Sequence, residues 1–436
     1  MQAVTGARSS AQARTISTSA WMTTTVFLMF RLYAQRMTTL YASQNDCVPS
    51  DDILHLINLD RSGQILMPRL KLLNWTTGRA SLPWLHHLLS PTLSVIHIDF
   101  NGGRTTPVNV AVIKALPTTN LKHIALSTLH TNAEVDGAVL DLILNSKPLK
   151  SVYIQQEADT GGTSPYDGEV EGERAPIELG NLMSMTVVFK TEPALLSSLF
   201  NRTTFPNIRE IYVKHSGRTE WSGVDDLFDP MLRSASPGAL HTLRYLSQYH
   251  GMSITTFRIR TLCRFVALRI LRVTSLCTSN QCKFLLSDDD VSTIATAMPD
   301  LVELHLGGVP CASEVDVSIN GIAVLAANCL KLTELQIHFD TARFIEKALD
   351  VSSEPTLPSQ LTQSSCKLTQ LIVGRISLSN GMNGYWTVAT ALLQIFPNLG
   401  SIKYSQHTFN GDWGEVMRII KVQRKVTSLM ASSATV

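Results

Sequence analysis

One short phrase dominates the apolar pattern of the chain: L-x-x-L-x-L, in which Ile, Val, Met or an aromatic residue sometimes replaces Leu. Leu93-Ser-Val-Ile-His-Ile98 and Leu301-Val-Glu-Leu-His-Leu306 are clear copies. The copies begin at Met37, Leu70, Leu93, Leu121, Leu149, Leu182, Ile208, Leu240, Leu268, Leu301, Leu332, Leu368 and Leu399. Successive copies start about 30 residues apart, slightly above the 20–29 residues of leucine-rich repeats.

The spacing within the phrase predicts a strand. Alternate side chains of a strand face the same side, so positions 4 and 6 point into the protein and positions 3, 5 and 7 point away. Stacking such strands in parallel buries a continuous aliphatic ladder that no single repeat could bury alone. We therefore predict an α/β fold, a leucine-rich-repeat-like solenoid with parallel strands on its concave face and helices on its convex face.

Helical signals lie between the phrases. Apolar residues recur at helical spacing in Val135–Leu144, Ile254–Phe265 and Tyr385–Phe396. Ser287 and Asp290 are spaced as in a capping box, with Asp in place of Glu, and predict a helix that begins there. We interpret the acidic run Asp288–Asp290 as stabilising the dipole of that helix rather than as a metal cluster.

The distribution of the phrase predicts the domain organisation. Residues 1–30 precede the repeats and are expected to be a disordered or wrongly assigned segment. Their many Ser, Thr and Ala residues, with Arg and no acid before Asp46, make mitochondrial targeting an alternative. Residues 31–426 are predicted to form a single solenoid that closes with an amphipathic helix around Trp413–Val426, and residues 427–436 a tail. Residues 157–178 are poor in large apolar side chains and predict an acidic loop insertion, with a second loop at residues 352–365.

Composition narrows the function classes. A net charge of +2 gives the chain no general affinity for nucleic acid or an acidic membrane, and the apolar run Ala20–Phe30 is too short to span a bilayer. The basic stretch at residues 258–283 is interpreted as a solvated helix face, with an acidic partner as the alternative. Seven cysteines without a CxxC pair indicate reduced, mostly buried thiols in a cytoplasmic or nuclear protein.

The sequence contains no motif typical of catalysis. GxSxG, HExxH and GxxxxGK[ST] do not occur, so we predict a protein that is not an enzyme and that uses no cofactor or metal. The candidate functional residues are instead those that the phrase projects onto the concave face, where aromatic and amphipathic side chains are typical interface anchors. They are His97, Asp99, Tyr153, Gln155, Tyr212, Lys214, His305, Gln336 and His338.

The order of the phrases resembles that of the F-box/leucine-rich-repeat-like proteins of mushroom-forming fungi. Segments that carry the resemblance include Leu82-Pro-Trp-Leu-His-His-Leu-Leu-Ser-Pro-Thr-Leu93, Pro299-Asp-Leu-Val-Glu-Leu-His-Leu306 and Leu325-Ala-Ala-Asn-Cys-Leu-Lys-Leu-Thr-Glu-Leu335. The resemblance implies that the repeats hold a protein substrate while an N-terminal F-box docks an adaptor of a cullin-type ubiquitin ligase. Nothing before Arg31 looks like an F-box, because the first Leu-Pro pair is Leu82-Pro83.

These observations predict a protein-binding receptor or scaffold whose partner docks on the concave face. The resemblance adds substrate recognition for a cullin-type ligase. Two alternatives come from other classes: an enzyme whose site is assembled by long-range contacts, and a nucleic-acid-binding protein that uses residues 258–283. The first would show a deep pocket of converging acid, base or metal ligands. The second would show strongly salt-dependent binding.

Overall fold

Repeats of a strand, followed in most cases by a helix, build the chain. A computed structural model describes residues 28–29, 31–43, 65–76, 85, 87–100, 106–130, 133–157, 176–190, 194–216, 224–248, 253–254, 256–275, 283–284, 286–308, 317–341, 345, 365–373, 381–404 and 411–433. Each of the 13 phrases forms a strand, and within each of the two compact units described below these strands pair in parallel in chain order. This confirms the predicted α/β, leucine-rich-repeat-like fold.

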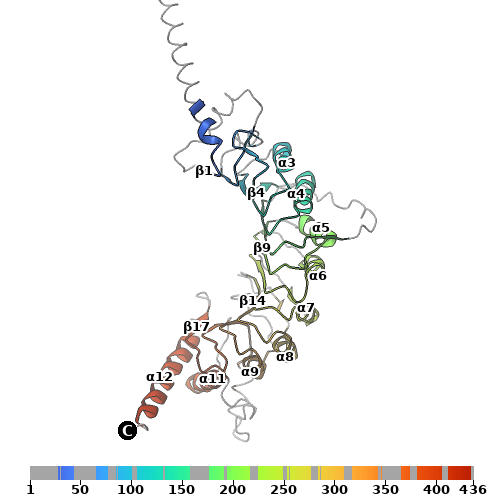
Figure 1. Cartoon of the computed structure of the whole chain (residues 1–436). Coiled ribbons are helices and arrows are strands. Elements are labelled where there is room, and N and C mark those ends of the chain that lie inside the picture. The colour runs from blue at the N-terminus through green and yellow to red at the C-terminus, as the bar shows by residue number, and fades with distance from the viewer. Residues whose placement is uncertain are drawn as a thin grey trace, which may run out of the picture. The chain divides into compact units, whose positions relative to one another are not determined.

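The first of two compact units comprises Met1–Glu171. Its parallel strands are β1 (Thr39–Ser43), β2 (Leu72–Thr76), β3 (Val95–Asp99), β4 (His123–His130) and β5 (Ser151–Glu157). Its helices with described bounds are α3 (Thr106–Ala115) and α4 (Ala133–Asn145). Figure 1 shows both helices on the same side of the strands. A bulge between Leu126 and Leu129 shifts the register of β4 on β5, and Thr128 adopts a positive φ of 53° within it.

The second unit comprises Gly172–Val436. Its main strands are β7 (Ser184–Phe189), β9 (Glu210–His215), β10 (Thr242–Ser247), β12 (Ile270–Ser275), β14 (Glu303–Gly308), β15 (Glu334–Gln336), β16 (Gln370–Val373) and β17 (Ser401–Tyr404). Its helices with described bounds are α5 (Ala194–Arg202), α6 (Val224–Ser234), α7 (Thr256–Leu262), α8 (Asp288–Ala297), α9 (Ile319–Asn328), α11 (Gly381–Ile395) and α12 (Gly411–Ser433). Two short parallel pairs lie outside the main strands: β6 (Ile177–Glu178) with β8 (Thr203–Thr204), and β11 (Ser253–Ile254) with β13 (Lys283–Phe284).

The structure adjusts the predicted boundaries. The chain divides between Glu171 and Gly172, inside the predicted acidic insertion, and the prediction that the repeats form a single solenoid stays a prediction. The closing helix α12 continues beyond the predicted Val426 to Ser433, and the assignment of residues 427–436 to a tail stays a prediction. Residues 1–27, 158–175 and 351–364, which hold most of the predicted N-terminal segment and loops, lie outside the described residues.

The core of each repeat is the aliphatic ladder that the phrase predicts. In β12 burial alternates strictly, with Leu271 and Val273 inside and Ile270, Arg272 and Thr274 partly exposed. Leu271 is hydrogen-bonded in register between Leu243 and Leu304 of the neighbouring strands, and all three are fully buried. Position 1 of the phrase is also buried in every copy except Met37. Each leucine therefore packs against its equivalents in the adjacent repeats.

Cysteines at two helix-to-strand junctions form a second, smaller ladder. The Cys329 thiol lies 3.6 Å from the carbonyl oxygen of Met298, and the Cys366 thiol lies 3.6 Å from that of Cys329. Burial raises the pKa of Cys329 to about 12 and also raises that of Cys366. Both thiols are thus small buried side chains that stay protonated at neutral pH, which fits their sequence-based interpretation.

The start of α8 confirms the predicted capping box and adds a role for its first acid. The Ser287 hydroxyl accepts a hydrogen bond from the Asp290 backbone N–H, and the Asp290 carboxylate accepts one from the backbone N–H of Ser287 at 3.0 Å. The Asp288 carboxylate accepts hydrogen bonds from the backbone N–H and the hydroxyl of Ser318 at 2.7 and 2.6 Å. Since Ser318 is the N-cap of α9, Asp288 ties the first turn of one helix to that of the next.

Gly321 of α9 provides a test of this link. A Cβ at Gly321 would overlap the Asp288 carboxylate, so we expect Gly321→Ala to displace that carboxylate from Ser318 and lower the free energy of unfolding by about 1 kcal/mol. In an Asp288→Ala background the added Cβ no longer meets a carboxylate. Because Ala has a higher helix propensity than Gly, Gly321→Ala should then raise the free energy of unfolding by up to about 1 kcal/mol. Urea unfolding of the four proteins in this double-mutant cycle measures both values.

Gly238→Ala is the control, because an added Cβ there meets no atom within 4 Å. It should change stability by no more than about 0.5 kcal/mol. If Gly321→Ala had the same effect with and without Asp288, the proposed contact between the two helices would be wrong.

Candidate functional site

A row of polar side chains follows the outward face of the second unit. Tyr212, Arg244, Arg272, His305 and Gln336 occupy the same register position on β9, β10, β12, β14 and β15. This is position 5 of the phrase, which points away from the helices. Adjacent parallel strands lie about 4.8 Å apart, so each of these side chains can reach the next strand and the longest ones can reach the strand beyond it.

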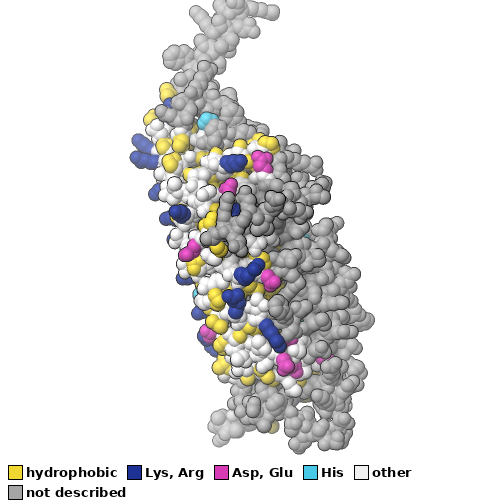
Figure 2. Space-filling model, turned by 90° about the vertical axis from the view of Figure 1, so that its right-hand side faces the viewer, with side chains coloured by type: hydrophobic (Ala, Val, Ile, Leu, Met, Phe, Trp, Pro, Cys, Tyr) yellow, Lys and Arg dark blue, Asp and Glu magenta, His cyan; other side chains and the backbone are white. Residues whose placement is uncertain are grey.

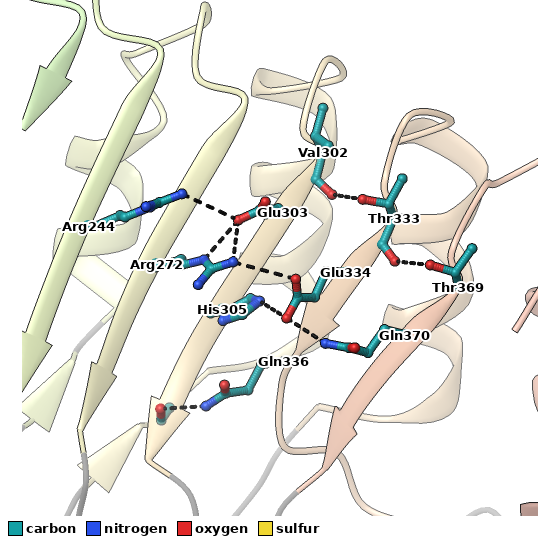
Figure 3. Close-up of polar contacts among 11 residues, drawn as sticks. Arg244, Arg272, Val302, Glu303, His305, Thr333, Glu334, Gln336, Thr369 and Gln370 are labelled. Carbon is teal, nitrogen blue, oxygen red and sulfur yellow. Dashed lines mark hydrogen bonds and ion pairs between the residues drawn. The ribbon is translucent and has the colours of Figure 1, made fainter. Parts of the chain in front are cut away.

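A second polar row lies two residues earlier on the neighbouring strands. Glu303, Glu334 and Gln370 share one register position on β14, β15 and β16. The Arg272 Nε atom donates to Glu303 Oε2 at 2.8 Å, and its Nη2 atom lies 3.5 Å from Glu334 Oε2. Gln370 donates to Glu334 Oε1 at 2.6 Å. Figure 3 shows this network running across β12, β14, β15 and β16, with Arg272 contacting both glutamates.

Arg244 is the less neutralised of the two arginines. Its Nη2 atom lies 3.9 Å from Glu303 Oε2, a long distance for a charge-assisted pair, and Glu303 is already held by Arg272. The Arg244 side chain is 40% exposed. Within the part of the chain that the structure describes, its buried Nε atom has no hydrogen-bond partner. Arg244 therefore retains donors for an additional anion.

His305 lies beside the arginines and is neutral. Its side chain is 6% exposed, and its Nε2 atom lies 3.3 Å from Glu334 Oε1 without the geometry of a hydrogen bond. Burial, followed by the charges of Arg272 and Arg244, lowers the pKa of His305 to about 3. The contact with Glu334 is therefore not an ion pair at neutral pH. The two arginine charges thus add to burial in keeping His305 neutral.

These side chains surround a hollow of about 250 Å³, which we call the strand-face hollow. Its lining includes Tyr212, Arg244, Arg272, His305 and Gln336, with Leu246 and Thr274 from the next outward position. Gln336 is fixed there because its Nε2 atom donates to the carbonyl oxygen of Gly307 at 3.0 Å. The hollow thus has an aromatic ring, two guanidinium groups and a neutral imidazole at its boundary.

Three of the predicted residues, Tyr212, His305 and Gln336, meet in the strand-face hollow. His305 and Gln336 are more buried than the sequence suggested, at 5% and 6% exposure. His338 follows β15 and is also buried. Its ring packs against Gly307, whose φ of +118° and missing Cβ leave room for it. Lys214 faces outward on β9, beside Leu246 of β10.

The remaining predicted residues belong to the first unit and are partly exposed on its outward face. Tyr153 of β5 donates its hydroxyl hydrogen to Gln155 Oε1 at 2.9 Å. His97 of β3 lies 3.5 Å from the Ser127 hydroxyl, and Asp99 follows on the same face. These four residues are therefore placed on the predicted side of the strands, and their role in binding stays a prediction.

Sequence reasoning missed the charged core of the site. Arg244, Glu303 and Glu334 were not selected, and Arg272 was treated as one member of a basic stretch. Their positions 3 and 5 in the phrase were nevertheless a usable signal, because opposite charges at outward positions of successive repeats must come close together in a parallel stack. The choice of aromatic and amphipathic residues passed over them.

The basic stretch at residues 258–283 does not form one surface. Arg272 points outward from β12, whereas Arg260 and Arg264 are exposed on and after α7, where the Arg264 guanidinium lies 5.8 Å from the Phe265 ring centre. Figure 2 views the molecule from the helix side and shows Lys and Arg side chains spread over it, with Asp and Glu between them. The described residues of this face therefore show no continuous basic stripe of the kind that nucleic-acid binding favours.

Among the described residues, no three His, Cys, Asp or Glu side chains come together as a metal site would require. None of the helices in the same part of the chain has the length and apolar character needed to cross a membrane.

Comparison with known proteins gave one kind of match. No protein-family model matches the chain, and no curated protein does so either. Among solved structures, a chain in the crystal structure of the Rad7 and Elc1 complex in yeast is similar, with 12% sequence identity and a TM-score of 0.39. The match covers 86% of this chain and 93% of that chain. Similarity at this level says nothing about partners or activity.

Proposed function

We propose that this protein is a binding scaffold whose protein partner inserts an acidic side chain into the strand-face hollow beside Arg244. The observation that carries the proposal is the incomplete pairing of Arg244 next to a neutral, buried His305. A partner carboxylate could accept two parallel hydrogen bonds from a guanidinium group, the geometry for which arginine is best suited. Tyr212 and Leu246 provide the apolar surroundings that strengthen such a contact.

The size of the hollow favours a protein partner over a small molecule. At about 250 Å³ it lies just below the range of about 300–1,000 Å³ typical of small-molecule sites, whereas it suits a single side chain. The outward face of parallel strands also continues on both sides of the hollow, so further residues of a partner can lie across β9, β10 and β12. Binding of a protein accounts for these features without requiring a catalytic group.

The test is quantitative affinity purification with the full chain and with two charge-reversal variants. Arg244→Glu places a negative charge where the partner carboxylate would bind, so partners should be recovered at least about tenfold less well, equivalent to about 1.4 kcal/mol. Arg233→Glu on α6 is the matched control, since Arg233 is exposed in the helix layer, and it should leave recovery unchanged. Equal recovery with all three proteins would contradict the proposal.

The resemblance to F-box/leucine-rich-repeat-like proteins supports a finer hypothesis, that the bound protein is a substrate of a cullin-type ubiquitin ligase. This hypothesis predicts adaptor and cullin peptides in the same purification. Because the hollow would bind the substrate and not the adaptor, Arg244→Glu should lower substrate recovery while adaptor recovery stays constant. Recovery of a partner without adaptor or cullin would leave the scaffold role intact and remove the ligase role.

A further inference from the structure

The C-terminal helix presents an apolar stripe that the fold does not cover. Val422, Val426, Leu429 and Met430 of α12 are 49%, 48%, 60% and 68% exposed. Their spacing of 4, 3 and 1 residues places them on one side of the helix. Farther toward the start of α12, Trp413, Val416 and Ile420 are buried and hold the helix to the second unit. The exposed stripe begins where this anchoring ends.

The stripe forms one wall of a groove whose other wall is α11. Figure 1 shows α11 and α12 adjacent at the end of the second unit. Between them lies a hollow of about 410 Å³, lined by Trp386 and Leu393 of α11 and by Val422 and Val426 of α12. Gln423 donates to the Thr390 hydroxyl at 2.9 Å and so joins the two walls. Trp386 is 44% exposed, so the groove has an accessible aromatic wall.

Charge marks one side of the groove. Helical spacing places Arg418, Lys421 and Lys425 in one row beside the stripe, and all three are exposed. Glu415 is the last acidic residue of α12, and the sequence of α11 has no charged residue. In sequence, neither α11 nor the part of α12 after Glu415 contains an acidic residue. The exposed half of α12 therefore has a basic border.

We propose that this groove binds an amphipathic helix of another protein whose apolar face is bordered by Asp or Glu. Two antiparallel or parallel helices form a groove into which the side-chain ridge of a third helix packs. Acidic residues beside that ridge would lie opposite Lys421 and Lys425. A second copy of this chain is a poor occupant, because it would bring a second basic row against the first. Binding of the exposed half of α12 to an anionic membrane is a separate outcome of the experiment below.

This surface is separate from the strand-face hollow in the residues that form it, since the hollow is lined from β9 to β15 and the groove from α11 and α12. The two proposals therefore succeed or fail independently. Arg244→Glu should leave peptide binding in the groove unchanged, and it is the control variant for the selection experiment described next.

The experiment is selection from a displayed library of amphipathic peptides of about 18 residues against the full chain. Each peptide carries leucines at positions i, i+3 or i+4, and i+7, and carries Glu or Lys at random beside them. At these positions we expect Glu to occur at least about ten times as often as Lys among the selected peptides. Lys421→Glu combined with Lys425→Glu should reverse the preference. Val426→Ser combined with Leu429→Ser should weaken binding at least about tenfold.

All four substituted residues are exposed, so the circular dichroism spectrum and melting temperature should match those of the unsubstituted chain. Three outcomes would overturn the proposal: selection of no peptide, selection without a charge preference, and equal binding by the Val426→Ser, Leu429→Ser variant. Two parallel measurements address the other occupants. If no peptide were selected and the Val426→Ser, Leu429→Ser variant lost self-association, the groove would bind a second copy of the chain. If that variant instead lost binding to phosphatidylserine vesicles, the groove would bind a membrane.

Discussion

Leu271→Ala is expected to lower the free energy of unfolding by about 2–5 kcal/mol. Leu271 is fully buried and lies in register between Leu243 and Leu304, which are fully buried as well. Removing the Cγ atom and the two Cδ methyl groups leaves a cavity in the middle of the ladder and weakens the contacts of one repeat with both neighbours. Urea unfolding followed by circular dichroism measures the loss.

Ile270→Ala is the matched control for this change. Ile270 is the preceding residue of the same strand, has the same number of atoms as Leu271 and faces outward, where it is partly exposed. Its truncation should cost about 1 kcal/mol or less. Equal losses for the two variants would mean that β12 does not have the register described above.

Asp136→Asn is expected to stabilise the protein at pH 8 and to have little effect at pH 4. Asp136 of α4 is 8% exposed, and its carboxylate accepts a hydrogen bond from Gln156 of β5 at 3.1 Å. Burial raises the pKa of Asp136 from 3.8 to about 7, and the hydrogen bond from Gln156 opposes part of this rise. The folded protein therefore keeps the proton over a pH range in which the unfolded chain releases it.

Because the folded protein binds this proton more tightly than the unfolded chain does, the free energy of unfolding falls as the pH rises. Below about pH 4 the carboxyl is protonated in both states, and between about pH 4 and pH 7 the stability falls as the unfolded chain loses its proton first. Above pH 7 the folded protein holds a buried charge, at a cost with an upper limit on the order of 4 kcal/mol for three pKa units. An asparagine carries no charge and can still accept the hydrogen bond from Gln156, so this cost disappears.

Urea unfolding at pH 4 and at pH 8 measures the difference between the variant and the unsubstituted chain. The matched control is Asp141→Asn, because Asp141 is exposed on the same helix. Its substitution should change stability by the same small amount at both pH values. If Asp136→Asn changed the stability equally at both pH values, the buried Asp136 carboxyl would not be the source of the expected loss of stability at high pH.

The two binding proposals differ in how far the sequence leads to them. Position 5 of the phrase already pointed to the row containing Tyr212, His305 and Gln336. The groove between α11 and α12 was not foreseen, because the sequence pattern ended the closing helix at Val426 and assigned Leu429 and Met430 to a tail. An exposed stripe continues the apolar spacing of a helix, but spacing alone does not show whether another element covers it.

The sequence by itself determined the repeat, the parallel strands and their inward residues. The alternation of buried and outward residues in a strand and the N-cap at Ser287 are local properties. Residues a few positions apart determine them, so they can be predicted without knowing how the rest of the chain packs. Thirteen copies of the phrase repeat the same local preference. An irregular copy therefore does not change the fold that the other copies predict.

Only the tertiary structure decided which outward residues meet. Arg244, Arg272, Glu303 and Glu334 are brought together by the register of four strands, and the long arginine side chains choose among several carboxylates in reach. Burial of His305 and of the Asp136 carboxyl likewise depends on neighbouring strands and helices. Desolvation and charge pairing act through space, so their outcome is set by stacking and not by the order of residues along the chain.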